Sequence, residues 1–191
     1  MIKLIKFIFL CFFFFSLHAI EKEKNFISFN EAKESQDFIK FQIKSTKVGL
    51  FTSEVDGYVK NFSYSFNKEK AGKIKEKAKV VLVSDSFDTD SSSRDEKMKD
   101  LCLETTKFKK ITITILDSLK ENSPKGIVSA QIEIRGKVHP IKVFMHFVKK
   151  GDAEFIEGEA NLSFSNLEIP DPSIAVASVS DEIKISFFLK L

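Results

Sequence analysis

The sequence predicts an all-β protein: one antiparallel barrel of about eight strands, with a short capping helix near residues 93–102. Segments in which apolar and polar residues alternate recur along most of the chain, and this alternation is typical of strands with one buried and one solvated face. Turn-forming residues separate these segments. No feature that would protect the edges of an open sheet is evident, so closure into a barrel is expected.

The first nineteen residues are expected to be a secretory signal peptide that lies outside the fold. The segment MIKLIKFIFLCFFFFSLHA begins with Lys3 and Lys6, continues with an apolar run and ends at Ala19. Its uncharged stretch is shorter than the ~20 apolar residues of a membrane-spanning helix, which favours a cleaved leader over an anchor. We therefore expect residues 20–191 to form a single exported domain, periplasmic or secreted after cleavage near Ala19.

Composition and charge argue against several classes of protein. The chain has 30 basic and 27 acidic side chains and a net charge of +3, with no basic stripe interleaved with aromatic residues. Nucleic acid is therefore not an expected partner. After removal of the leader Cys102 is the only cysteine, so no intramolecular disulfide is expected. The remaining residues are numerous enough to bury a core or to enclose a cavity.

Individual segments define the expected strands. In ITITI, for example, three isoleucines fall on one face and two threonines on the other. The expected strands are residues 38–44, 54–66, 79–84, 111–115, 127–134, 141–147, 155–164 and 182–191. Turns are expected at residues 67–72, 123–126 and 150–152.

One segment breaks the period-two pattern. In SSSRDEKMKDL, Ser93 is followed three residues later by Glu96, which is the spacing of a capping box and predicts a helix start at Ser93. Met98, Leu101 and Cys102 then share one apolar helix face. A second irregular segment, residues 169–179, has two prolines and few polar side chains, and we expect it to cover the barrel.

Four residues are expected to have structural roles. Arg94 is expected to anchor the helix to the end of a strand, together with Asp95, in preference to contacting a ligand head group. Gly136 permits a tight reversal between two strands. Pro140 lacks a backbone N–H and is therefore expected at the first position of a strand or on an edge.

The inward-facing side chains are the candidates for ligand binding, because they would line the interior of a barrel. An eight-stranded barrel is either filled by side chains or holds one slender ligand, and alternation alone favours neither outcome. The candidates are Phe41, Phe62, Met98, Leu101, Ile111, Ile113, Ile132, Ile134, Ile141, Val143, Met145, Phe147, Leu162, Phe164, Ile185 and Phe187.

Catalytic and metal-binding chemistry finds little support in the sequence. His139 and His146 lie seven residues apart on adjoining parts of one expected hairpin. This odd spacing places them on opposite faces, and they are interpreted as surface residues. Cys102 is interpreted as a small buried hydrophobe without a histidine partner. The four aspartates between residues 85 and 95 lack the spacing of a calcium loop. We expect no enzyme activity, no cofactor and no metal.

Three segments resemble motifs of the YceI-like family. AQIEIRGKVHPIKVFMHF resembles that family's strand–turn–strand, with Arg135, Gly136, Pro140 and Phe147 at matching positions. The segment at residues 88–113 resembles the family's helix-opening motif, and the segment at 161–189 resembles its closing strand. The order and spacing hold from about residue 38 to residue 189.

The resemblance implies a lipocalin-like barrel that holds a long apolar chain without catalysing a reaction. The ligand classes it implies are polyisoprenoids, isoprenoid quinones and fatty acids or amides, bound for transport, storage or sequestration. It also implies a homodimer as an expected assembly, and a transient contact with a membrane surface fits a lipid carrier. The alternative hypothesis is an exported barrel with a packed core, acting as a protein-interaction or stress-response module through an outer face that includes Phe144.

Overall fold

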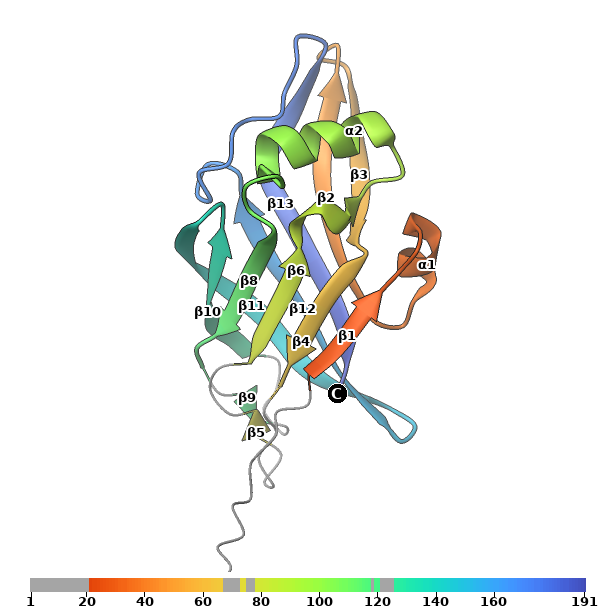
Figure 1. The fold of residues 1–191 in the computed structure, drawn as a ribbon, viewed down its shortest axis with the longest axis vertical. Coiled ribbons are helices and arrows are strands. Elements are labelled where there is room, and N and C mark those ends of the chain that lie inside the picture. The colour runs from red at the N-terminus through yellow and green to blue at the C-terminus, as the bar shows by residue number, and fades with distance from the viewer. Residues whose placement is uncertain (1–20, 67–72, 75–77, 118, 121–125) are drawn as a thin grey trace, which may run out of the picture.

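The computed structural model describes residues 21–66, 73–74, 78–117, 119–120 and 126–191. The expected leader, the expected turn at residues 67–72 and most of the expected turn at residues 123–126 lie outside the described residues. Eleven of the described strands form one sheet that curls around an interior, and a helical segment crosses one end of it (Figure 1). The predicted all-antiparallel class is confirmed.

The main sheet has eleven strands rather than the eight expected. They pair in the order β1-β4-β6-β8-β10-β11-β12-β13-β2-β3-β7, and β5 (Lys73–Ile74) pairs separately with β9 (Leu119–Lys120). The strands of the main sheet are β1 (Glu21–Asn25), β2 (Phe38–Lys47), β3 (Phe51–Val59), β4 (Asn61–Ser65), β6 (Lys79–Val83), β7 (Phe87–Asp88), β8 (Lys110–Ile115), β10 (Gly126–Ile134), β11 (Lys137–Lys150), β12 (Ala153–Ser163) and β13 (Ala177–Lys190).

The additional strands have identifiable causes. The sequence of β1, EKEKN, contains no apolar residue, and β7 is only two residues long, so neither shows an alternating apolar pattern. The expected strand at residues 54–66 divides at Lys60, whose N–H donates to Ser86 and whose carbonyl accepts from Phe26. β3 and β4 lie near opposite ends of the sheet order but are joined by Lys60 alone. The sheet must therefore curl until these two ends lie beside each other.

The helical elements are α1 (Phe29–Glu34), η1 (Ser84–Ser86), α2 (Ser92–Lys97) and η2 (Met98–Leu103). The expected helix is present, but the predicted cap is wrong: Ser91 precedes the first turn, and its side chain makes no capping hydrogen bond. η2 is a π-helix in which the N–H of Glu104 donates to the carbonyl of Lys99, five residues earlier. This wider turn changes which side chains share a face.

The β10–β11 turn consists of Arg135 and Gly136, both with positive φ, at 52° and 71°. Positive φ at both central residues is the signature of the hairpin turn that matches strand twist, and glycine adopts it without strain. Pro140 is the fourth residue of β11 rather than the first, opposite Gln131 of β10. Pairing of β11 with β12 begins only at Phe144, so the missing N–H of Pro140 interrupts no β11–β12 pair.

Gly158 of β12 is expected to tolerate no side chain. A Cβ at this position would lie 2.3 Å from Cζ of Phe187 and 2.5 Å from the carbonyl oxygen of Phe144 on the neighbouring strand. Because one of these atoms belongs to the backbone, Gly158→Ala should lower the free energy of unfolding by about 2–3 kcal/mol. Urea denaturation measures this loss. The exposed neighbour Glu159→Ala should change stability by less than about 0.5 kcal/mol, and equal effects would contradict the prediction.

Candidate ligand-binding cavity

The curled sheet encloses a cavity of about 270 Å³ whose wall is almost entirely apolar. Its lining comes from both halves of the sheet and from the helical segment that crosses its end. An engineered apolar cavity of about 150 Å³ stays dry and binds benzene. The larger space here is therefore suited to an apolar ligand rather than to ordered water.

Most of the side chains that the sequence placed inside line this cavity. Because Ile132, Val143 and Met145 border the space, the interior is not packed solid. The candidates that line it are Phe41, Met98, Ile111, Ile113, Ile132, Ile134, Ile141, Val143, Met145, Leu162, Phe164, Ile185 and Phe187.

Two strand residues among the candidates do not line the cavity. Phe62 is buried, but its ring packs between Phe26 and Tyr64, with centroids 6.2 Å from each. Phe26, which follows β1, supplies a partner that the sequence did not reveal. Phe147 lies near the end of β11, half-buried, and packs against a core cluster instead. Both side chains therefore belong to the interior core clusters without bordering the cavity.

Leu101 also fails to line the cavity, because it is 37% exposed. The prediction assumed an α-helix, in which residues three and four apart share a face. In the π-helix η2, the cavity is lined by Met98, Cys102 and Leu103. Cys102 and Leu103 follow Met98 by four and five residues, the spacing of side chains on one face of a wider helical turn. The change of helical period therefore turns Leu101 away from the interior.

Several lining residues were not predicted. The alternation in FIKFQIK, within β2, indicates Ile39 and Ile43 as readily as Phe41, and KVVLV of β6 indicates Val80 and Leu82. The irregular segment at residues 169–179, which the sequence placed over the barrel, supplies Ile169, Pro172 and Val179 to the lining. The lining residues outside the candidate set are Ile39, Ile43, Val55, Val59, Phe66, Val80, Leu82, Phe87, Thr89, Arg94, Lys97, Cys102, Leu103, Ile115, Ala160, Leu167, Ile169, Pro172, Val179, Ile183 and Leu189.

The few polar side chains of the wall gather at the end covered by α2. Thr89 follows β7, and its N–H and hydroxyl both donate to Oδ1 of Asp95, at 2.9 and 2.7 Å. Nη2 of Arg94 donates to the carbonyl of Thr89 at 2.7 Å. Thr89, Arg94 and Lys97 also border the cavity. The start of α2 is thus fixed to the end of a strand, and two cationic side chains stand at this end of an otherwise apolar space.

Cys102 is expected to be unreactive in the folded protein. Burial raises the pKa of its thiol, and the charges of Lys97 and Arg135 offset only part of this effect. Because the thiolate is the reactive form, a Cys11→Ser variant, in which Cys102 is the only cysteine, should react with Ellman's reagent at least about a hundredfold more slowly when folded than when unfolded in urea. Fast labelling of the folded protein at pH 7 would contradict this.

Among the described residues, the histidines and acidic side chains do not form a second site. His139 is buried rather than on the surface, because it lies on the same face of β11 as Val143 and Met145. His146 lies on the other face, with Nε2 3.4 Å from a carboxylate oxygen of Glu157. Within the described ranges, no group of three or more potential metal ligands converges. None of the helices in the described part of the chain is long and apolar enough to cross a membrane.

An antiparallel sheet curled around an apolar cavity, with a helix across one end, defines a binding-protein fold of the lipocalin-like barrel type. A family model described as a YceI-like domain matches residues 30–191. The chain belongs to the YceI-like family. A comparison with curated proteins gives no significant match.

Solved structures share this fold at low sequence identity. BcnA of Burkholderia cenocepacia superposes with a TM-score of 0.65 at 16% identity, covering 80% of this chain and 96% of that one. A polyisoprenoid-binding domain from Saccharophagus degradans, implicated in plant cell wall breakdown, gives 0.58 at 15% identity, covering 80% and 94%. The YceI protein of Campylobacter jejuni gives 0.58 at 21% identity, covering 74% and 86%.

Proposed function

We propose that this chain is a non-catalytic binding protein that holds one long apolar chain in its cavity. The ligand is a polyisoprenoid, an isoprenoid quinone or a fatty acid or amide. The observation that carries the proposal is the continuous apolar cavity of about 270 Å³ inside the curled sheet. A similar fold in a protein described as a polyisoprenoid-binding domain supports the ligand class.

The energetics of such a ligand fit this wall. Each buried methylene contributes ~0.8 kcal/mol, so about ten of them contribute roughly 8 kcal/mol before the cost of ordering the ligand is subtracted. No charged partner is needed along the chain. Met98 and Met145 provide adaptable, polarisable contact surface for ligands of differing shape.

The orientation of the ligand follows from the asymmetry of the wall. Thr89, Arg94 and Lys97 stand at the end covered by α2, whereas the far end is formed by Ile115 and Met145. Burying a polar head group among aliphatic side chains would cost desolvation free energy, because it would lose its hydrogen bonds to water. Near α2 the same head group would find hydrogen-bond donors. The ligand therefore lies with its apolar tail toward β8 and β11 and its polar end under the helix.

The decisive experiment is lipid extraction from the purified protein, followed by mass spectrometry. We expect a long-chain lipid in near-stoichiometric amount, and we expect the stripped protein to take up decylubiquinone or oleic acid. Repeated recovery of no lipid, together with no uptake of either probe, would overturn the proposal. Cell fractionation tests the export that the first nineteen residues predict, and recovery of the protein in the cytoplasm would count against a periplasmic carrier.

A further inference from the structure

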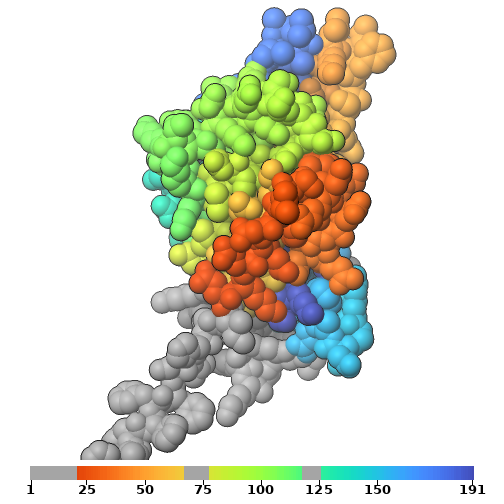
Figure 2. Space-filling view, turned by 45° about the vertical axis from the view of Figure 1, so that its right-hand side comes forward, coloured from red at the N-terminus to blue at the C-terminus, as the bar shows by residue number. Residues whose placement is uncertain are grey.

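Five large apolar side chains stand exposed at one end of the molecule. They belong to the β2–β3 turn, to the first residue of β3 and to the segment that leads into β13, and we call them the apolar tip. Their exposed fractions lie between 55% and 78%. In the space-filling view these two segments, orange and blue, project beyond the helical segment (Figure 2). The tip consists of Val48, Leu50, Phe51, Ile174 and Val176.

Backbone hydrogen bonds join the two segments into one unit. The N–H of Val48 donates to the carbonyl of Val176 at 2.9 Å. Ile174 and Ala177 exchange hydrogen bonds of 2.8 and 3.0 Å, which close the turn before β13. These hydrogen bonds hold the tip together as a continuation of β2, β3 and β13 rather than as separate loops.

The geometry of the β2–β3 turn does not explain why its first central residue is Val48. Val48 has φ of 51° and Gly49 has φ of 70°. Asparagine and glycine are favoured at the first central position of such a turn, and a β-branched residue there is a steric outlier. Val48 is also largely exposed, so no core contact compensates for the strain. An apolar side chain at a strained, exposed position indicates a role outside the folded core.

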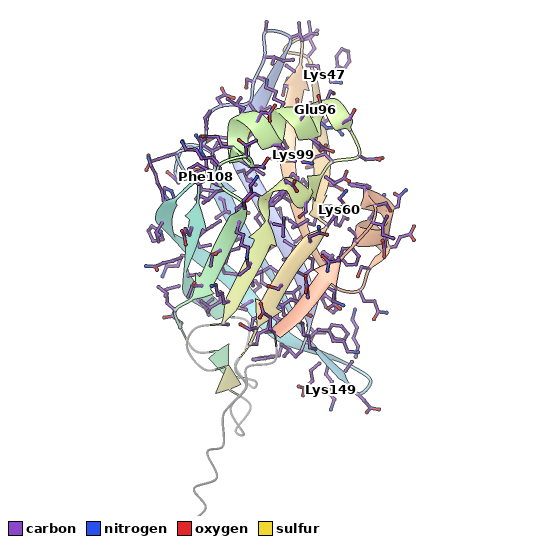
Figure 3. The ribbon with its side chains drawn as sticks, viewed as in Figure 1. Lys47, Lys60, Glu96, Lys99, Phe108 and Lys149 are labelled. Carbon is purple, nitrogen blue, oxygen red and sulfur yellow. The ribbon has the colours of Figure 1, made fainter. Side chains whose placement is uncertain are left out.

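The two segments that form the tip carry little charge of their own. Between Lys44 and Glu54 the only charged residue is Lys47, and between Asp171 and Asp181 there is none. Lys47 lies beside the tip and above the helix, at the opposite end of the molecule from Lys149 (Figure 3). The tip thus combines exposed apolar side chains with one lysine and no carboxylate, a combination that suits an anionic lipid surface.

The tip lies directly beyond one end of the cavity. The cavity is lined by Ile43 of β2, Val55 of β3 and Val179 of β13, and each lies a few residues from the tip along the chain. Phe51 is four residues from Val55 on β3 and therefore lies on the same face of the sheet. The apolar surface of the interior thus leads toward the tip.

We propose that the apolar tip inserts into the interfacial region of a lipid bilayer. The end of the cavity that lies next to the tip then faces the membrane. This inference rests on the proposed function, because a carrier of apolar chains must exchange them with a membrane. A narrow, projecting tip offers little of the flat area that a stable protein interface requires. It suits a bilayer, whose surface deforms around a small apolar wedge.

Single tryptophans test the contact directly, because the chain contains none. The test protein is Phe51→Trp, and the matched control is Ile127→Trp on β10, since these positions are 72% and 71% exposed. Vesicles of phosphatidylcholine and phosphatidylglycerol, with brominated acyl chains, should quench and blue-shift the emission at position 51 but not at position 127. Because each reporter senses only its own surroundings, membrane contact elsewhere in the chain does not confuse the result.

A second measurement is the partition of the protein onto the same vesicles by flotation. Leu50→Ser combined with Phe51→Ser should weaken the partition by about a hundredfold, because two large apolar side chains no longer enter the interface. Ile127→Ser combined with Val138→Ser, two exposed apolar residues distant from the tip in sequence, should leave it unchanged. Equal loss in both double variants would overturn the proposal.

The outcomes separate the inference from the proposed function. If the stripped protein takes up oleic acid from solution but tryptophan at position 51 shows no vesicle contact, the tip does not bind bilayers and the inference fails alone. If position 51 inserts but no lipid is ever bound, the proposed function fails and the membrane contact stands. Capture of a specific protein by the tip without vesicle insertion would also overturn the inference.

Discussion

Replacing Leu162 with tryptophan should abolish most lipid binding while leaving the protein folded. Leu162 lies on β12 and borders the cavity, so a larger ring at this position extends into space that the ligand would occupy. Displacing two or three methylenes costs about 2 kcal/mol, which corresponds to about a 30-fold weaker affinity. Titration of the stripped protein with decylubiquinone measures this change. Stability should shift by less than about 1 kcal/mol, because the added atoms fill existing space.

The adjacent residue provides the matched control. Asn161 precedes Leu162 on the same strand and faces solvent on the other side of the sheet. Asn161→Trp should therefore bind decylubiquinone as the unmodified protein does. An equal loss of affinity in both variants would show that tryptophan disturbs β12 generally, and unchanged affinity in Leu162→Trp would place the ligand outside the cavity.

Replacing Asp37 with alanine should cause the largest loss of stability, about 3–5 kcal/mol. Asp37 is buried, and its carboxylate accepts from Nζ of Lys24 at 2.6 Å and from the N–H of Lys190 at 2.5 Å. The hydroxyl of Tyr64 donates to the carbonyl of Lys190 at 2.8 Å and lies 3.5 Å from the same carboxylate. Burial and the charge of Asp37 both raise the pKa of Tyr64, which keeps its hydroxyl a donor. One carboxylate thus joins the N-terminal strand, β4 and the end of β13.

The free energy of unfolding in urea measures this prediction, and Asp56 supplies the control. Asp56 pairs with Lys40 at 2.8 Å and accepts from Gln42 at 2.8 Å, but its side chain is substantially exposed. Asp56→Ala should therefore cost less than about 1 kcal/mol. If the two variants lose the same stability, the buried network around Asp37 does not hold these strands together.

The strands were largely predictable, because each depends on a local pattern. In ITITI and FIEGEANLSF, alternation assigned the buried face, and the structure places Ile111, Ile113 and Leu162 in the interior as predicted. The charged strand β1 and the two-residue β7 carry no such pattern, since their pairing depends on partners elsewhere in the chain. The short helix α1 did carry a signal, because Ser28 and Glu31 have the capping-box spacing and Ser28 accepts from the N–H of Glu31.

The helix near residue 98 shows where local reasoning failed. Its position was predicted, yet Leu101 points outward and Leu103 inward. An α-helix and a π-helix differ by one residue in hydrogen-bond spacing, and the sequence MKDLCL does not distinguish them. The choice depends on how the segment must pass from Thr89 across the end of the sheet, which is a property of the whole fold.

The amino-acid sequence by itself determined the all-β class, the faces of most strands and the apolar character of the interior, because alternation with period two acts between near neighbours. Only the tertiary structure decided that this interior holds open space. The volume enclosed depends on the number of strands, on the bend at Lys60 that curls the sheet and on the helical segment above it. These are relations between residues distant in the chain, so the same inward-facing side chains fit a packed core or a cavity until their separation across the interior is known.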